Sequence, residues 1–137
     1  MKPLYVASLL LLGAALAYPA FAVSGKAADE GPALAHMVFF TLKDHSAEAV
    51  DALVKDCETY LTDHEGVVYF SVGKRAEDVE EPPSVKDFDV ALHVVFAARE
   101  YRDKYLASPR HDDFVAAIKS KLEKARVFDS YLSKKKS

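Results

Sequence analysis

Two side chains that handle protons stand close together in the stretch YLASPRH. Tyr105 carries a phenol and His111 an imidazole, and the pair Ser108 and Pro109 lies between them. A neutral imidazole can take a proton from a carbon next to a carbonyl, and a phenol can donate a hydrogen bond to the resulting oxygen. The alternative is structural: the two rings bond each other or the backbone and lock a corner.

The residues between these two side chains predict a bend between two helices. Ser108 suits the N-cap position, and Pro109 suits the first helical position, where a backbone N–H is not needed. His111 then falls in the first helical turn. The positive end of the helix disfavours a charged imidazole, whereas the nearby Asp112 and Asp113 favour one. If the helix field and burial prevail, His111 is neutral near neutral pH and able to accept a proton.

A third candidate residue, His36, lies in the apolar stretch at residues 33–42. It is either a core histidine with satisfied hydrogen bonds or part of a ligand pocket. The remaining histidines, His45, His64 and His93, are scattered, and none has the close pairing of a zinc site. We expect His93 under a helix or at an interface. The sequence contains no glycine-rich phosphate loop and no nucleophile elbow, so we predict no metal and no cofactor.

Hydrophobic periodicity and turn residues predict the elements that position these side chains. The expected strands are 33–42, 67–75, 88–96 and 126–132, and the expected helices are 47–64, 97–107 and 109–125. The order is β-α-β-β-α-β, with the second helical segment broken at Ser108 and Pro109. This order predicts a ferredoxin-like α+β fold, in which one antiparallel sheet has both helices on a single face.

Both faces of the predicted strands are mostly apolar. In the first strand, Val38 and Phe40 point to one side, and Met37 and Phe39 point to the other. Two helices cover only one face, and each large apolar side chain gains roughly 1.5–3 kcal/mol from burial. The simplest cover for the second face is another copy of the chain across a twofold axis. We therefore predict a homodimer in which two sheets pack face to face as an α/β barrel.

The first residues, MKPLYVASLLLLGAALAYPAFA, have the features of a secretory signal peptide. A lysine precedes a short apolar run, and small residues precede the expected cut after Ala22. A cut after Ala17 is the second choice, and an uncleaved anchor is the alternative. The apolar run is shorter than the ~20 residues of a spanning helix. We predict a signal peptide at 1–22, a linker at 23–33, a secreted or periplasmic protein, and no stable membrane insertion after cleavage.

Composition bounds the remaining functions. The chain has 137 residues, enough for one domain, and its net charge of −3 predicts no nucleic-acid partner. The basic tail at 133–137 is expected to be solvated. Cys57 is the only cysteine, so no intrachain disulfide forms, and its place on the apolar stripe of a predicted helix indicates a core residue.

With these pieces in order, the chain resembles the stress-responsive A/B barrel (Dabb) family, part of the dimeric α+β barrel superfamily. The resemblance covers residues 34–132 and rests on HMVFFTL, GVVYFSVGKR, DFDVALHVVF, YLASPRHDDFV and VFDSYL. It implies ferredoxin-like monomers that pair into a barrel. Many members have no assigned chemistry, some plant members are linked to stress, and one similar protein is a polyketide cyclase.

In that cyclase the tyrosine and histidine of the same motif act on the substrate, and they match Tyr105 and His111 here. The histidine of its first strand matches His36. The leading hypothesis is an exported homodimer of this family that binds a small apolar or aromatic molecule in the barrel or serves as a stable stress-associated module. It rests on the two apolar faces of the strands and on the three polar side chains expected around one cavity. The alternative is a cyclase- or lyase-like enzyme with His111 as general base and Tyr105 as hydrogen-bond donor. A third hypothesis is a filled, purely structural dimer. Other dimeric α+β barrels use haem. In this chain His111 or His36 would be the candidate ligand, but the sequence contains no haem-binding motif.

Overall fold

The structure is a computed structural model and describes residues 31–133. The predicted signal peptide, most of the predicted linker and residues 134–137 of the basic tail lie outside this range. The elements in chain order are β1 (Leu34–Leu42), α1 (Ala47–Leu61), β2 (Val67–Lys74), β3 (Val90–Phe96), α2 (Arg99–Leu106), α3 (Pro109–Ile118) and β4 (Leu122–Tyr131).

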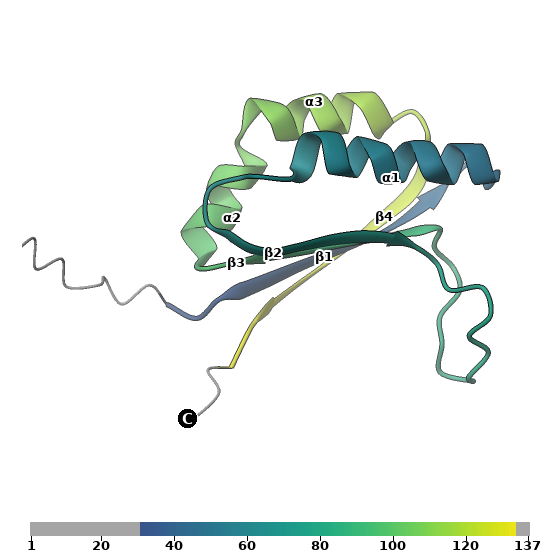
Figure 1. Cartoon of the computed structure of the whole chain (residues 1–137), viewed down its shortest axis with the longest axis horizontal. Coiled ribbons are helices and arrows are strands. Elements are labelled where there is room, and N and C mark those ends of the chain that lie inside the picture. Colours follow the sequence, from purple (N-terminus) through teal and green to yellow (C-terminus); the bar gives the residue numbers. More distant parts are fainter. Residues whose placement is uncertain (1–30, 134–137) are drawn as a thin grey trace, which may run out of the picture.

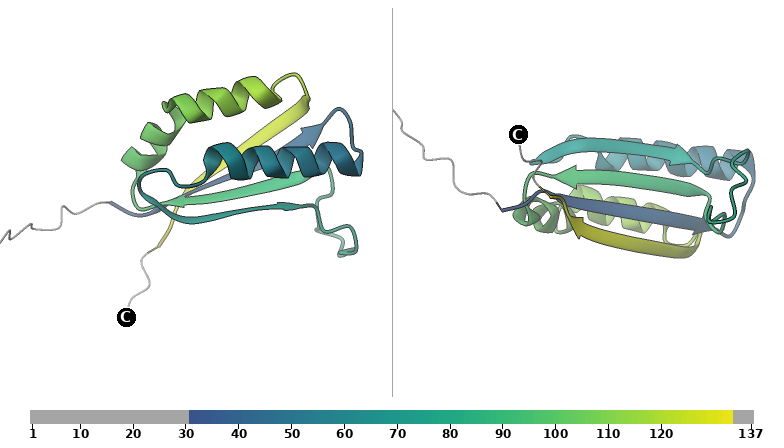
Figure 2. Two further views of the ribbon diagram at one scale, coloured as in Figure 1. Left: turned by 45° about the horizontal axis from the view of Figure 1, so that its top comes forward. Right: turned by 90° about the horizontal axis from the view of Figure 1, so that it is seen from below.

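The four strands form one antiparallel sheet in the order β2-β3-β1-β4. All three helices lie over one face of this sheet, and the other face carries no helix (Figures 1 and 2). The ferredoxin-like fold predicted from the sequence is therefore confirmed. The central strand pair, β1 and β3, carries most of the buried positions of the sheet.

The core forms between the helices and the covered sheet face. Alternate residues of the central strands, such as Phe40 and Leu92, pack against Leu53 and Phe114 of the helices. Cys57 is fully buried in this cluster, as its place on the apolar stripe predicted. Burial raises the pKa of its thiol to about 12, which keeps the sulfur protonated and unreactive.

Local sequence explains where α1 begins and how the chain turns into β2. The Ser46 hydroxyl accepts the Ala49 N–H at 3.3 Å and so caps the first turn of α1. After the helix, Gly66 adopts a φ of 75°. A Cβ at this position would lie 2.0 Å from a ring carbon of Tyr101, so only glycine fits.

The predicted boundary between the last helix and the last strand is wrong. The helix expected over 109–125 ends at Ile118, and β4 begins at Leu122 instead of residue 126. β4 pairs with β1 along the whole of β1, as far as Leu42 opposite Leu122. Hydrogen bonds to a neighbouring strand therefore override the helix-like pattern of residues 122–125.

The helix-free face of the sheet is aromatic. The Phe39 ring lies 5.0 Å from the Phe88 ring and 5.8 Å from the Phe128 ring, and Phe128 is 52% exposed. His93 lies on this face and not under a helix, with its Nδ1 3.2 Å from the Ser71 hydroxyl. The sequence-based expectation of two apolar faces thus holds for the central strands, and one face stays uncovered within the chain.

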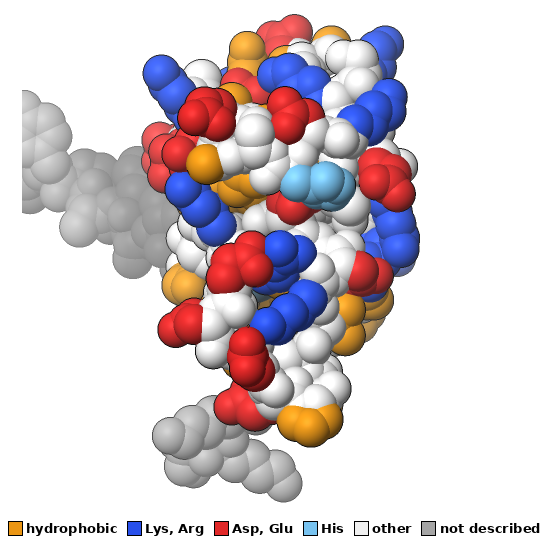
Figure 3. All heavy atoms as spheres, turned by 90° about the vertical axis from the view of Figure 1, so that its right-hand side faces the viewer, with side chains coloured by type: hydrophobic (Ala, Val, Ile, Leu, Met, Phe, Trp, Pro, Cys, Tyr) orange, Lys and Arg blue, Asp and Glu red, His pale blue; other side chains and the backbone are white. Residues whose placement is uncertain are grey.

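Charges of both signs are intermingled at the end of the molecule that contains the end of β1 and the loop between β2 and β3 (Figure 3). Asp87 there faces Arg126 and Lys124, and Lys74 pairs with Asp51. This surface shows no extended area of one sign. Within residues 31–133, no helix is long and apolar enough to cross a membrane.

Candidate functional site

The site begins at the corner between α2 and α3. The Ser108 hydroxyl donates a hydrogen bond to the Tyr105 carbonyl at 2.8 Å and accepts one from the His111 N–H at 3.2 Å. Pro109 occupies the first helical turn of α3. The predicted bend is therefore present, and one side chain ties the last turn of α2 to the first turn of α3.

The Tyr105 ring lies at the centre of a cluster of imidazoles. Its centroid is 4.9 Å from that of His64, 5.0 Å from that of His111 and 6.0 Å from that of His36. Tyr105 is only 2% exposed, and burial raises the pKa of its phenol above the ordinary value. A protonated phenol can donate a hydrogen bond, which is the role that the sequence suggested for it.

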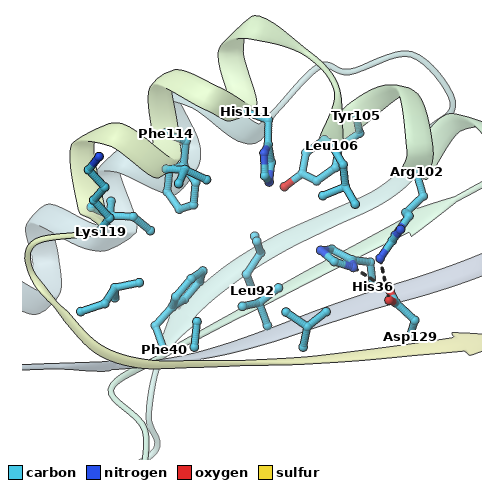
Figure 4. Close-up of a pocket in the computed structure, with 16 residues that line it drawn as sticks. His36, Phe40, Leu92, Arg102, Tyr105, Leu106, His111, Phe114, Lys119 and Asp129 are labelled. Carbon is cyan, nitrogen blue, oxygen red and sulfur yellow. Dashed lines mark hydrogen bonds and ion pairs between the residues drawn. The ribbon is translucent and has the colours of Figure 1, made fainter.

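These side chains reach a cavity of about 540 Å³ between the helices and the sheet, larger than the roughly 300 Å³ that marks the lower end of ligand pockets. Figure 4 shows His111 and Tyr105 above the cavity and His36 below it, with Lys119 at the opposite end. The lining residues are His36, Val38, Phe40, Leu92, Arg102, Tyr105, Leu106, His111, Phe114, Val115, Ile118, Lys119, Leu122, Ala125, Val127 and Asp129.

The floor of the cavity consists of cross-strand pairs of β1 and β4. His36 is opposite Asp129, Val38 is opposite Val127, and Phe40 is opposite Ala125. Directly opposite residues of an antiparallel pair share a face, so all of these side chains point toward the helices. The floor is polar at the His36 pair and apolar along the rest of its length.

An ion-pair network closes the polar end. His36 Nδ1 lies 2.7 Å from Asp129 Oδ1, and Arg102 Nη2 donates to Asp129 Oδ2 at 2.9 Å. Because the carboxylate accepts, the shared proton resides on His36 Nδ1, which leaves Nε2 as the ring nitrogen that Asp129 does not use. The network satisfies a buried histidine that would otherwise destabilise the core.

The electrostatics of His111 favour its neutral form. Burial is the main cause that lowers its pKa, and the neighbouring His36 adds to the effect, whereas Asp112 opposes it. A neutral His111 can accept a proton, so the structure satisfies the condition that the sequence left open. The side chain is half-buried and lines the cavity, within reach of a bound molecule.

All three sequence-predicted site residues, His36, Tyr105 and His111, line the same cavity. Sequence reasoning missed Arg102 and Asp129, which complete the polar end. Arg102 carried no motif, and Asp129 became relevant only through the pairing of β4 with β1. The sequence also gave no reason to place His64 against Tyr105.

Between residues 31 and 133, no group of three or more histidine, cysteine or acidic side chains could hold a metal ion. The imidazoles of the cluster each lie against the Tyr105 ring.

The lowered pKa of His111 predicts that its imidazole is protonated only at a lower pH than a free histidine. Its folded-state pKa lies below the unfolded value of about 6.5, so the folded state binds fewer protons in that range. The stability contributed by neutral His111 is thus present above the unfolded pKa and lost as the pH falls through the folded pKa. We expect an NMR titration of the His111 ring to show a midpoint below 6.5.

A matched variant separates the contribution of His111 to the pH dependence of stability from that of the other histidines. In His111→Gln, acidification should cost less free energy of unfolding than in the unmodified protein, because the group that protonates on unfolding is gone. A His111 midpoint at or above 6.5 would contradict the assignment.

Comparisons with known proteins agree with this architecture. The family model of the stress responsive A/B barrel domain matches residues 34–132. No curated protein matches the sequence. A Dabb family protein with a ferredoxin-like fold from Mesorhizobium loti has 23% identity and a TM-score of 0.64, over 76% of this chain and 100% of that chain.

Two further solved structures share the fold. A dimeric ferredoxin-like protein of unknown function from Thermobifida fusca has 14% identity and a TM-score of 0.63, over 75% of this chain and 93% of its own. A hydroxynitrile lyase from Passiflora edulis has 16% identity and a TM-score of 0.61, over 77% of this chain and 98% of its own. At these identities the likeness shows the fold alone. The family match spans most of the chain, and the protein therefore belongs to the stress responsive A/B barrel (Dabb) domain family.

Proposed function

We propose that this protein is an exported homodimer that binds a small apolar or aromatic molecule in the cavity between its helices and its sheet. The observation that carries the proposal is the cavity of about 540 Å³, whose walls are mostly apolar and most of whose polar groups lie toward one end. Ligand pockets of proteins combine these two features. A filled structural domain would leave no such space.

The dimer is supported by the exposed aromatic face of the sheet. Phe39, Phe88 and Phe128 form one cluster there, and an apolar groove beside it is also lined by Val85 and Arg126. A second copy would bury this cluster against its equivalent. Two of the similar structures are described as dimeric, which favours the same use of the face.

Export is supported only by the sequence of residues 1–22, which lies outside the described residues. A basic start, a short apolar run and small residues before the expected cut are typical of a cleaved signal.

Native mass spectrometry tests self-association. We expect the protein to have twice the subunit mass and Phe128→Glu to have the mass of one subunit, because a buried unpaired carboxylate costs several kcal/mol. Ala116→Glu is the control, since it adds the same charge on the exposed surface of α3. A single subunit at high concentration without any substitution would refute the dimer. The subunit mass also reports whether residues 1–22 have been removed.

Filling the cavity tests ligand binding. Ala125 lies on the cavity floor and is exposed, so Ala125→Trp should occupy the space without disturbing the core. A ligand that loses about 60 Å² of apolar contact loses roughly 1.5 kcal/mol, or about tenfold in affinity. We expect this loss for butylbenzene, measured by ligand-observed NMR, whereas Ala116→Trp on the outer surface of α3 should bind as before. Equal affinity in both variants would place the binding elsewhere.

A second candidate function is lyase- or cyclase-like catalysis in the same cavity. The favouring observation is a neutral His111 whose ring lies 5.0 Å from that of a buried, protonated Tyr105. His111 would take a proton from the substrate, and Tyr105 would donate a hydrogen bond to the substrate oxygen. The similar fold of a hydroxynitrile lyase makes cyanohydrin cleavage a reaction to assay beside β-polyketone cyclisation.

The catalytic candidate predicts a large effect of one substitution. His111→Ala should lower the rate by about 10²–10⁴-fold, the usual contribution of a general base, while circular dichroism shows an unchanged fold. His45→Ala is the control, because His45 is exposed and does not line the cavity. Activity that survives in His111→Ala, or absence of turnover by the unmodified protein on both substrates, would exclude this candidate and leave the binding function.

A further inference from the structure

Arg102 stands at the polar end of the ligand cavity. Its side chain extends from α2 toward Asp129 on β4 (Figure 4). The same pair, Arg102 and Asp129, also lines a second cavity of about 350 Å³. The ion pair therefore lies where the mostly apolar cavity meets a more polar one.

The guanidinium of Arg102 has donors that the protein does not use. An arginine side chain presents five N–H donors. Nη1 donates to Asp103 Oδ1 at 3.2 Å and Nη2 donates to Asp129 Oδ2 at 2.9 Å. Nε is buried and has no hydrogen-bond partner within residues 31–133. The side chain is nevertheless 24% exposed, so part of the guanidinium is open to a bound molecule.

Within the described residues, no acceptor is bonded to Arg102 Nε. Asp129 is engaged on both oxygens, by His36 and by Arg102, and the cavity beyond Tyr105 is lined mainly by apolar side chains. We propose that the ligand carries an oxygen acceptor, a carbonyl or a carboxylate, which lies against Arg102, while its apolar body extends along β4 toward Leu122. Arg102 thereby selects the head group and sets the orientation of the ligand.

The charges around Arg102 fit an acceptor better than a cation. A cationic head would compete with the guanidinium for Asp129 and meet a like charge. A carbonyl or carboxylate oxygen accepts from the unused N–H groups without displacing Asp129. The adjoining second cavity lets a charged head keep part of its hydration, which reduces its cost of burial. This inference rests on the proposed ligand binding and adds the chemistry of the head group.

Three probes with one apolar body test the inference. Butylbenzene has no acceptor, 4-butylacetophenone has a neutral carbonyl, and 4-butylbenzoate has a carboxylate. We expect the protein to bind one or both of the acceptor probes roughly tenfold or more tightly than butylbenzene, since a hydrogen bond to a charged group has about this value. Arg102→Met should remove this preference, which is measured as the ratio of the two affinities within the same variant.

Lys104→Met is the matched control, because it removes one positive charge from the exposed side of α2 and touches neither cavity. It should retain the preference. If butylbenzene binds and neither acceptor probe binds more tightly, the inference is wrong and the binding function stands. If none of the three probes binds, both are wrong. A preference that persists in Arg102→Met would place the head group at another donor of the cavity, such as Tyr105 or Lys119, and overturn the role of Arg102.

A second measurement avoids any loss of folding in Arg102→Met. The Nε–H resonance of Arg102 can be followed by NMR in the unmodified protein during titration with each probe. We expect 4-butylacetophenone or 4-butylbenzoate to shift this resonance and butylbenzene to leave it in place. Equal shifts with all three probes would show that Arg102 senses occupancy of the cavity and not the acceptor.

Discussion

The geometry of the site depends on two hydrogen bonds of the Ser108 hydroxyl. One holds the last turn of α2 and the other caps the first turn of α3, so the two helices meet as a fixed corner above the sheet. Because of this corner, the Tyr105 ring points down into the protein and His111 faces the same space from the next helix. The corner thus both joins the two helices and directs Tyr105 and His111 to one cavity.

The parts of this arrangement that depend on residues close together in the sequence could be predicted from the sequence. The N-cap at Ser108, the proline after it and the order of strands and helices are local signals, and they were correct. The end of α3 was not, because residues 122–125 join β4 through pairing with β1, which no local pattern encodes. Arg102 and Asp129 were missed for the same reason. Arg102 is 27 residues from Asp129 in the sequence, and Asp129 is 93 residues from His36.

Two buried donors without a partner in the described chain mark surfaces on opposite sides of the sheet. Arg102 belongs to the lining of the cavity between the helices and the sheet, and Arg126 belongs to the lining of the groove on the aromatic face. Unpaired buried donors are uncommon in folded proteins, and each calls for an explanation. Here both belong to residues at surfaces where a second molecule, a ligand or another copy of the chain, is proposed to bind.

The register of β4 against β1 is what turns these sequence elements into a pocket. It places His36 opposite Asp129 and Phe40 opposite Ala125, so the polar pair stands at one end and a small residue next to a large one leaves space at the other. A slip of one residue would turn Asp129 and Ala125 to the aromatic face and leave His36 buried without its carboxylate. The burial of His36 thus favours the same register that forms the cavity, which links the stability of the sheet to the polarity of the site.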